Sequence, residues 1–286
     1  MNTYNSIYLE SRRKLRAAGV AAHDLEARLI VAHASGKTRE ELLTSSGLYV
    51  TDTAIQCAVD DMIERRIGGE PVAYIVGEWE FYGLPIIVNE SVLIPRVDTE
   101  VLADVAITLM KRRGWQTRII DLCTGSGCVG LAIAANVPTC KVVLADVSEH
   151  ALAVCRANIL RNTLTRQVTA IEVDVIELPP ALLGVFDAVV CNPPYIPTRD
   201  LIDLDPSVRD HEPILSLDGG PDGLYVIRAI ATNWPAMLKP AGNLVLECGV
   251  GQADAVCEIM EDSGFKEIKT HLDTLGIKRV VVGTLK

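Results

Sequence analysis

The residues best suited to chemistry are Asn192, Pro193, Pro194 and Tyr195, which follow an apolar run at residues 186–191. The run predicts a buried strand. Proline lacks an N–H and fixes φ, so two successive prolines end the strand and stiffen the turn that leaves it. The side-chain oxygen of Asn192 and the adjacent carbonyls then form a rigid row of hydrogen-bond acceptors, which suits a planar NH2 group with two hydrogens to donate. An Asn-Pro pair alone is typical of a simple strand-ending turn, so the rest of the chain must decide between the two interpretations.

A glycine-rich loop, Cys-Thr-Gly-Ser-Gly at residues 123–127, stands between a predicted strand and a predicted helix. Gly125 and Gly127 allow a sharp turn and a close approach of the backbone to a ligand, and a helix N-terminus favours anionic groups. Together with Gly130 they spell G-x-G-x-x-G, so a nicotinamide cofactor has to be considered. No G-K-S/T follows, which excludes a Walker-type phosphate loop.

Two acidic residues follow the next strands of the chain. Asp146 ends the run Val-Leu-Ala-Asp, and an acid at that place commonly accepts hydrogen bonds from two ribose hydroxyls. The alternative is an acid at a helix N-terminus before Ser148. Asp174 comes after the third strand, where it could meet an adenine amine, and Val175 could pack on the adenine ring. These positions favour a nucleoside cofactor without choosing its type.

The acceptor row at Asn192 separates nicotinamide from adenosyl cofactors. A hydride-transferring enzyme needs a proton-transferring His, Lys or Tyr near the hydride, and Tyr195 is the sole candidate we find. An amine or amide held at Asn192 instead fits methyl transfer from a sulfonium, a leaving group good enough for catalysis to rest on alignment and electrostatics. The residues therefore favour a methyltransferase.

The elements that position these residues are predicted to form an α/β domain at residues 96–286. Strand and helix alternate there, which implies a mostly parallel sheet covered on both faces. The last two strands are joined by only four residues, so the last must run antiparallel to its neighbour. The prediction is a seven-stranded, doubly wound, Rossmann-like sheet. Its strands are expected at residues 118–122, 141–146, 168–173, 186–191, 243–248, 265–271 and 278–282.

Two smaller parts precede this domain. Residues 1–69 are predicted to be all-helical, and Leu25, Leu29 and Ile30 are expected to face inward while Asp24, Glu26 and Arg28 face outward. A second helix carrying Ile55, Val59, Met62 and Ile63 should end at Gly68-Gly69. Residues 70–95 read as a β-hairpin linker. Within it, Phe81 belongs either to the core or to the wall of a pocket.

Composition sets limits on the function. The chain has 286 residues and a formal net charge of −10, which argues mildly against a broad nucleic-acid surface. It has no apolar run long enough to span a membrane. The eight cysteines form no C-x-x-C pair, so we expect no metal site and no disulfide framework. The chain is thus expected to be a cytoplasmic protein, and we expect a monomer.

With these residues in view, the chain resembles the HemK/PrmC family, the glutamine methyltransferases that act on peptide chain release factors. The resemblance extends from the helical part to the C-terminus. The acceptor motif alone is shared with adenine amino-methyltransferases, but the combination of motifs is specific. They are Gly77–Tyr82, Leu93–Glu100, Asp121–Gly127, Asn192–Tyr195, Val208–Pro213 and Gly219–Gly223.

The resemblance implies a class I methyltransferase domain, a hairpin linker and an N-terminal helical domain that docks the substrate. It implies S-adenosylmethionine as cofactor, S-adenosylhomocysteine as product, and the glutamine of a release factor Gly-Gly-Gln motif as substrate. Translation termination is the process that such methylation would tune. Carried over by motif, the implied cofactor residues are Cys123, Thr124, Gly125, Ser126, Gly127, Asp146, Asp174, Val175 and Asn192.

The implied substrate residues are Asn192, Pro193, Pro194 and Tyr195, to which Phe81 is added. Catalysis would rest on Asn192, Pro193 and Tyr195. In this hypothesis the Asn192 Oδ1 atom and the Pro193 carbonyl accept both amide hydrogens of the glutamine, which steers the nitrogen lone pair toward the methyl group.

Two positions depart from the family pattern. Cys123 replaces a usual glycine, so the loop is expected to avoid positive φ there. Val175 stands where some members have an aromatic residue, so weaker stacking on adenine is expected.

Two other functions compete with this one. An enzyme that methylates the exocyclic amine of adenine in DNA or RNA would use the same acceptor row after flipping the base. A docking protein without enzymatic activity would account for the helical part, but it would leave Asn192 and the glycine loop without a role.

Overall fold

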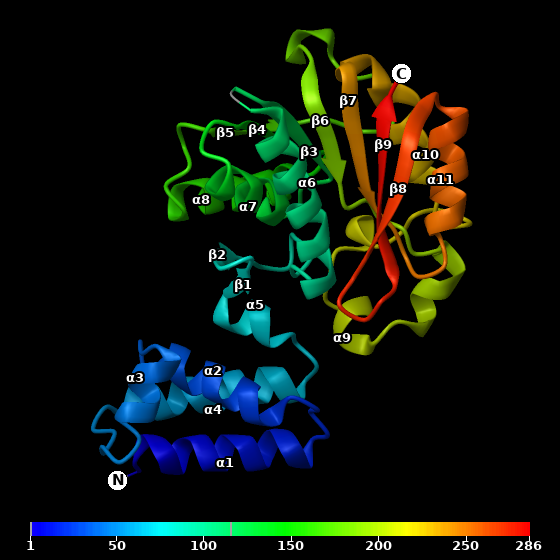
Figure 1. The fold of residues 1–286 in the computed structure, drawn as a ribbon. Helices are drawn as coiled ribbons and strands as arrows, with labels where there is room; N and C mark the ends of the chain where they lie inside the picture. The colour runs from blue at the N-terminus through cyan, green and yellow to red at the C-terminus, as the bar shows by residue number, and fades with distance from the viewer. Residues whose placement is uncertain (1, 115) are drawn as a thin grey trace. The chain divides into compact units, whose positions relative to one another are not determined.

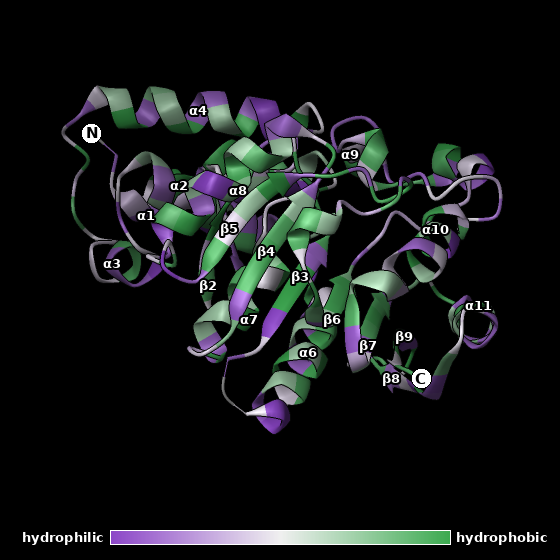
Figure 2. Cartoon of the chain, turned by 90° about the horizontal axis from the view of Figure 1, so that it is seen from above, coloured by the Kyte–Doolittle hydropathy of each residue, from purple (hydrophilic) through white to green (hydrophobic). Residues whose placement is uncertain are grey.

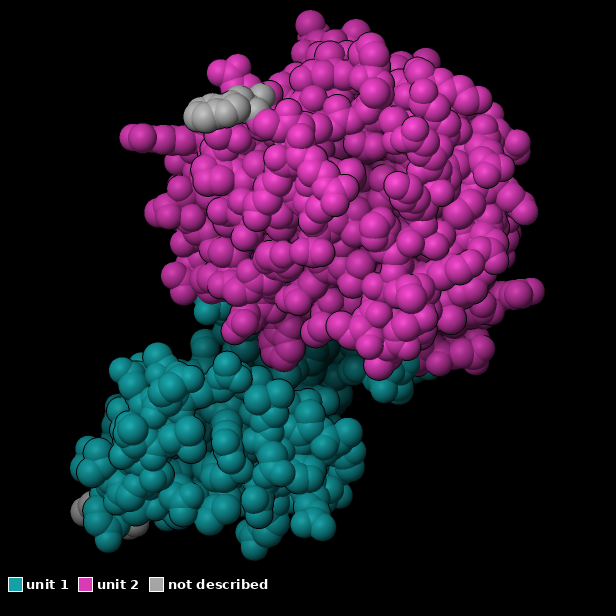
Figure 3. Space-filling model, viewed as in Figure 1, with its two compact units in different colours: residues 1–78, 205–211 teal, residues 79–204, 212–286 magenta. Residues whose placement is uncertain are grey.

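The computed structural model describes residues 2–114 and 116–286. The chain divides into two compact units, which Figure 3 shows in different colours. One unit comprises residues 1–78 and 205–211, and the other comprises residues 79–204 and 212–286. The short segment 205–211 thus belongs to the first unit although it lies far along the chain, and we describe each unit by itself.

The first unit is helical, as predicted. Polar side chains cap several of its helices: Thr3 accepts from the Ser6 backbone N–H before α1, and Thr38 forms a capping box with Glu41 before α3. The longest helix ends at Gly68, where the sequence predicts a stop. The helices are α1 (Tyr4–Ala17), α2 (His23–Ala34), α3 (Arg39–Thr44), α4 (Thr53–Ile67), α5 (Val72–Val76) and α9 (Pro206–Arg209).

The prediction for α2 is confirmed for the buried Ile30 and the exposed Asp24 and Arg28, but it is wrong for Leu25 and Glu26. Leu25 is 45% exposed, whereas Glu26 is only 8% exposed and lies on the buried face with Ala27 and Ile30. Glu26 is tolerated inside because both of its carboxylate oxygens accept hydrogen bonds from the Arg66 guanidinium, at 2.5 and 3.4 Å. The helical stripe is therefore shifted by a buried ion pair between α2 and α4, which hydrophobic periodicity cannot reveal.

A β-hairpin follows within the predicted linker of residues 70–95, with strands β1 (Glu78–Phe81) and β2 (Leu84–Ile87), but the start of that range is the helix α5 and not part of the hairpin. Tyr82 and Gly83 form its two-residue turn with φ of 51° and 75°, the left-handed values that primed hairpin turns require. Glu100, the first residue of α6 (Glu100–Arg113), accepts from the Tyr82 backbone N–H at 2.8 Å. The hairpin turn is thereby attached to the first turn of α6.

Within the described residues, seven strands form the sheet of the second unit, which confirms the predicted sheet. Their spatial order is β5-β4-β3-β6-β7-β9-β8, and the last strand β9 runs antiparallel to both of its neighbours. The chain order does not predict that β9 inserts between β7 and β8. The strands are β3 (Arg118–Leu122), β4 (Lys141–Asp146), β5 (Val168–Glu172), β6 (Phe186–Cys191), β7 (Leu238–Glu247), β8 (Phe265–Leu272) and β9 (Lys278–Leu285).

Helices cover both faces of the sheet (Figure 1). On one face, α10 (Tyr225–Asn233) and α11 (Ala253–Asp262) pack in a core with Trp234 and the inward residues of β3, β6 and β7. On the other face lie α6, α7 (Cys128–Asn136) and α8 (Glu149–Arg161). The central strands are mainly hydrophobic along their length (Figure 2), and all residues of β6 are buried. Such continuous burial is typical of a parallel strand covered on both sides.

The strand order changes direction at β3, which has β4 on one side and β6 on the other. The loops that leave the carboxyl ends of β3 and β6 therefore diverge toward opposite faces and open a crevice between them. Ligands of open α/β sheets bind in this crevice, so the topology points to one end of the sheet as the site. No helix in the described part of the chain is long and apolar enough to cross a membrane.

Candidate active site

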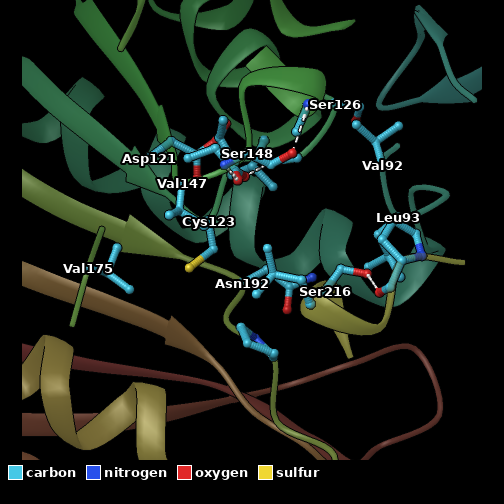
Figure 4. A pocket seen from close by; sticks show the side chains of 18 of the residues that line it. Val92, Leu93, Asp121, Cys123, Ser126, Val147, Ser148, Val175, Asn192 and Ser216 are labelled. Atoms are coloured by element: carbon cyan, nitrogen blue, oxygen red, sulfur yellow. Dashed lines mark hydrogen bonds between the residues drawn. The ribbon is translucent and has the colours of Figure 1, made fainter. Parts of the chain in front are cut away.

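A cavity of about 1100 Å³, including its open mouth, lies at the carboxyl ends of the parallel strands. Figure 4 shows Asn192 between Cys123 and Ser216, with Asp121, Val147 and Ser148 grouped on one side. Its position matches the crevice between the loops that leave β3 and β6, where open α/β sheets bind their ligands. The site residues predicted from the sequence should therefore line this cavity.

The glycine-rich loop lines this cavity with Cys123, Thr124, Gly125 and Ser126. Gly127 begins helix α7 from a φ of 84°, and a Cβ added there would lie 2.8 Å from Cys155 Sγ. This crowding, rather than contact with the cavity, requires a glycine at residue 127. The loop therefore turns sharply at the entrance of α7, as predicted.

The expectation that Cys123 avoids positive φ is wrong, because its φ is 51°. An L-residue in the left-handed region costs roughly 1–2 kcal/mol. Hydrogen bonds of the next residue hold the turn in place: the Thr124 backbone N–H donates to the Ala145 carbonyl at 3.1 Å, and its hydroxyl donates to Asp121 at 2.6 Å. The loop keeps its left-handed shape despite the side chain.

Asp121 organises the loop from below, a role that we did not assign from the sequence. It is 1% exposed, and its Oδ2 atom accepts both from Thr124 Oγ1 and from the Gly130 backbone N–H, at 2.6 and 3.0 Å. Burial raises the pKa of this carboxyl group to about 7. The third glycine of the pattern is required by packing, since a Cβ at Gly130 would lie 2.2 Å from Leu144 Cδ2 and 3.2 Å from Asp121 Oδ2.

Asp146 lines the cavity at the end of β4. Its Oδ2 atom accepts from the Gly125 backbone N–H at 2.8 Å, and its Oδ1 atom accepts from the Ser148 N–H at 3.0 Å. Burial raises the pKa of the Asp146 carboxyl group. Each carboxylate oxygen has two lone pairs, so both oxygens retain capacity for a ribose hydroxyl.

Asp174 and Val175 also line the cavity. The Asp174 Oδ1 atom accepts from the Ile176 backbone N–H at 2.9 Å, and Val175 is 7% exposed. Together with Val147 they give the cavity one charged group and an apolar wall. This combination suits a planar base with an exocyclic amine, and the roles of the two residues remain predictions.

Of the acceptor motif, Asn192 and Pro194 line the cavity, whereas Pro193 and Tyr195 do not. The Asn192 Nδ2 atom donates to Thr99 Oγ1 at 3.2 Å, so the amide nitrogen already has a partner. The Tyr195 hydroxyl donates to Glu247 Oε1 at 3.4 Å. Burial raises the pKa of Tyr195 further above its ordinary value, so its phenol stays protonated.

Phe81 lies outside the set of residues that line the cavity. It is 1% exposed at the end of β1, which matches packing, the first of the two alternatives that the sequence leaves open. Its predicted contact with substrate is not supported by its position in the structure.

The backbone of the acceptor motif is held from outside the cavity. Gln252 donates to the Tyr195 carbonyl at 2.9 Å and accepts from the Gly249 N–H at 2.8 Å. A Cβ at Gly219 would lie 2.8 Å from the Pro194 carbonyl oxygen, and one at Gly223 would lie 2.3 Å from that of Tyr195. Close backbone packing thus fixes the carbonyls of Pro194 and Tyr195. The glycine motif at residues 219–223 therefore supports the acceptor motif from outside the cavity.

Two segments that sequence reasoning left without a role in the site border the cavity: residues 91–99 and residues 213–216. Glu212 joins them, because its carboxylate accepts from the Arg96 guanidinium and from the Ile94 backbone N–H. The motifs that contain these residues are visible in the sequence, but their proximity is not, because more than a hundred residues separate them.

The residues present fit S-adenosylmethionine. The cavity combines a carboxylate at the end of β4, a glycine loop whose backbone turns beside it, and apolar side chains around Val175. In the described part of the chain, no group of three or more His, Cys, Asp or Glu residues is arranged to hold a metal ion.

Comparisons with known proteins agree with this geometry. Residues 7–77 match the family model "PrmC N-terminal domain", and residues 98–203 match "Methyltransferase small domain". The chain is 38% identical to a release factor glutamine methyltransferase of Caulobacter vibrioides over 96% of this chain and 93% of that protein. It is 34% identical to a bifunctional methyltransferase of Rickettsia felis, over 94% of this chain and 55% of that protein. The chain thus spans about half the length of the bifunctional relatives.

A solved structure shares the fold. The hMettl16 catalytic domain in complex with a MAT2A 3′UTR hairpin superposes with a TM-score of 0.59 at 16% identity, over 79% of this chain and 81% of that one. At this identity the likeness concerns the fold alone. Together with the family match, it confirms the predicted class I methyltransferase domain.

Proposed function

We propose that this chain, which belongs to the release factor glutamine methyltransferase family, methylates the side-chain amide nitrogen of the glutamine in the Gly-Gly-Gln motif of peptide chain release factors. The family predicted from the sequence motifs is confirmed by the 38% identity over nearly the whole chain. The bifunctional relatives are about twice as long as this chain, so the proposed activity has to be measured on this chain itself.

Bound S-adenosylmethionine would supply a methyl group on a sulfonium, which is strongly electrophilic. The residues that would hold it are the loop from Cys123 to Gly127 and Asp146, with Asp174 and Val175 toward the base. Their contribution is to bind and orient, since they present backbone N–H groups, carboxylate oxygens and an apolar wall. No proton transfer is needed from any of them.

The observation that carries the proposal is the orientation of the Asn192 amide. Its Nδ2 atom is engaged with Thr99, so its Oδ1 atom is the end left to accept a hydrogen bond inside the cavity. A primary amide has two N–H donors, and we propose the Pro193 carbonyl, next to Asn192 in the chain, as the second acceptor. The site thus recognises an NH2 group rather than a hydroxyl or a carboxylate.

Holding both hydrogens would also aid the reaction. An amide nitrogen is a weak nucleophile because its lone pair is delocalised into the carbonyl group. Acceptors placed on both N–H bonds would restrict the direction of the lone pair and stabilise the positive charge that develops as the nitrogen–carbon bond forms and the sulfur–carbon bond of S-adenosylmethionine breaks. With S-adenosylhomocysteine as the leaving group, the methylated nitrogen would lose one of its two protons to solvent, which restores the neutral amide. Alignment of this kind accounts for several orders of magnitude in rate.

The direct test is incubation of the purified chain with labelled S-adenosylmethionine and a class 1 release factor, followed by peptide mass analysis. A methyl group on the Gly-Gly-Gln glutamine supports the proposal, and its absence from a release factor whose glutamine is replaced by alanine identifies the site. Transfer to adenine in an oligonucleotide but not to the release factor would contradict the proposal in favour of a nucleic-acid methyltransferase.

We further propose that the helical unit docks the substrate protein, as its match to the PrmC N-terminal domain suggests. KM for an intact release factor should then be lower than KM for a short Gly-Gly-Gln peptide. Replacing the exposed Leu25 by glutamate should raise KM for the intact factor without changing KM for the peptide. Equal effects on both substrates would contradict docking through this unit.

A further inference from the structure

Two buried residues connect to Asn192: Thr99, which lies in the Leu93–Glu100 motif without an assigned role, and Glu247, which lies in none of the motifs. Thr99 ends the 3₁₀ turn η1 (Val97–Thr99) and is 2% exposed, and Glu247 ends strand β7 and is 1% exposed. The Thr99 hydroxyl donates to Glu247 Oε1 at 3.2 Å and accepts from Asn192 Nδ2 at 3.2 Å. Cys191 pairs with Leu246 across the sheet, so Glu247 lies level with Asn192 on the neighbouring strand.

The number of protons fixes the direction of this chain of hydrogen bonds. A carboxylate can only accept, and a threonine hydroxyl has a single proton to donate. When Thr99 gives that proton to Glu247, it can only accept on its other side. The group that faces it must then be a donor, which on Asn192 is Nδ2 and not Oδ1. The carboxylate thereby determines which end of the Asn192 amide turns toward the cavity.

We propose that Glu247, acting through Thr99, is a positioning residue that keeps the Oδ1 atom of Asn192 turned toward the substrate amide. This inference rests on the proposed function, because the orientation matters only if an NH2 group binds there. Glu247 touches neither the cavity nor a reacting atom; it hydrogen-bonds both Thr99 and the Tyr195 hydroxyl, and the effect proposed here is the one exerted through Thr99 on Asn192.

A protonated Glu247 would lose this control. It could donate to Thr99, the hydroxyl could then turn its proton toward Asn192, and the amide could reverse so that its NH2 group faced the substrate. Two donors would then oppose each other, and the substrate amide would have one acceptor fewer. The active form is therefore the one in which Glu247 is ionised.

The surroundings of Glu247 place its titration in the working range. Burial raises its pKa to about 7, Asp98 adds to the increase, and the Arg279 guanidinium on β9 opposes it. Thr99 and the Tyr195 hydroxyl hydrogen-bond the carboxylate and also lower its pKa. Within the described residues, the thiols of Cys128 and Cys248 also interact with it electrostatically. Activity should therefore rise with pH through about 7, since ionisation restores the productive orientation.

The experiment compares Thr99→Val, Thr99→Ser and Glu247→Gln with the wild-type chain on an intact release factor. Thr99→Val should lower kcat by roughly 10- to 100-fold while KM for S-adenosylmethionine is retained, and Thr99→Ser should restore most of the rate because it keeps the hydroxyl. Glu247→Gln should lower kcat and weaken the acidic limb of the pH profile, leaving only the part that Asp121, whose pKa is also about 7, contributes. Thr117→Val and Asp187→Asn are matched controls, since both residues are buried at the opposite end of the sheet.

A second readout does not depend on activity. The side-chain NH2 resonances of Asn192, assigned in the cofactor-free chain by their loss in Asn192→Ser, should shift with a midpoint near pH 7 in the wild type and stay constant in Glu247→Gln. A Thr99→Val variant with wild-type kcat, or resonances that titrate equally in both proteins, would overturn the inference. A wild-type chain that titrates as expected but does not methylate the release factor would contradict the proposed function instead.

Discussion

Arg96 and Glu212 join the two segments that border the cavity, because the Arg96 Nη2 atom donates to Glu212 Oε1 at 2.5 Å. The Glu212 Oε2 atom also accepts from the Ile94 backbone N–H at 3.2 Å. The carboxylate is almost completely buried, whereas the guanidinium is partly exposed. The Glu212 side chain thus holds residues 91–99 beside residues 213–216. These two segments form part of the cavity wall.

Replacing Glu212 by alanine should therefore weaken cofactor binding and lower the free energy of unfolding. The loss leaves the Ile94 N–H without its partner and the segment 91–99 without its attachment, a change worth about 1–3 kcal/mol. Isothermal titration with S-adenosylmethionine and denaturant unfolding measure the two effects. Glu149→Ala is the matched control, because its 2.5 Å pair with Arg156 is exposed and should contribute little. Equal losses in both variants would contradict the role given to Glu212.

Gly127 should tolerate a methyl group poorly. Alanine at this position would be strained at a φ of 84° and would also crowd Cys155 and Leu144. Gly276→Ala is the matched control, since its φ is 78° but nothing lies within 4 Å of an added Cβ. We expect the control to lose about 1 kcal/mol of stability and Gly127→Ala to lose roughly 1–3 kcal/mol more, measured by denaturant unfolding. Similar losses would show that the crowding is relieved easily.

Tyr195 should not act as an acid or a base, although its place in the motif predicts a catalytic role. Burial raises its pKa, so the phenol is neutral throughout the range in which the protein is assayed. Its hydroxyl instead hydrogen-bonds Glu247 at the long distance of 3.4 Å. Tyr195→Phe should consequently lower kcat by less than about tenfold and leave the alkaline side of the pH profile unchanged. The kcat-versus-pH profile of the variant decides this, and loss of an alkaline limb would contradict the assignment.

Much of the fold could be predicted because local patterns control it. The strands β3, β4 and β6 begin and end at the predicted residues, since each is an apolar run bounded by turn-forming residues and buried on both faces. The four-residue connection before β9 predicts its antiparallel direction. The insertion of β9 between β7 and β8 depends on side-chain packing across the sheet, which chain order does not encode.

The site could be predicted only where its residues share a motif. Asp146 and Asn192 stand at strand ends beside turn-forming sequences, so their roles in the site can be predicted from the sequence. Thr99 and Glu247 are 148 positions apart, and only the folded chain brings their oxygens within hydrogen-bonding distance. Glu26 illustrates the same limit in the helical unit, because a partner 40 residues away makes a charged residue part of the core. The left-handed Cys123 shows that surrounding hydrogen bonds can outweigh a local preference.

The central claim is that Asn192 holds the NH2 group that becomes methylated, and the most direct test is the Asn192→Ala variant. Its kcat on a release factor should be compared with its dissociation constant for S-adenosylmethionine, measured by isothermal titration. The account predicts that kcat falls by roughly 10²-fold or more while the dissociation constant for the cofactor stays close to that of the wild type. A variant that binds the cofactor and methylates the glutamine at a near-normal rate would contradict it.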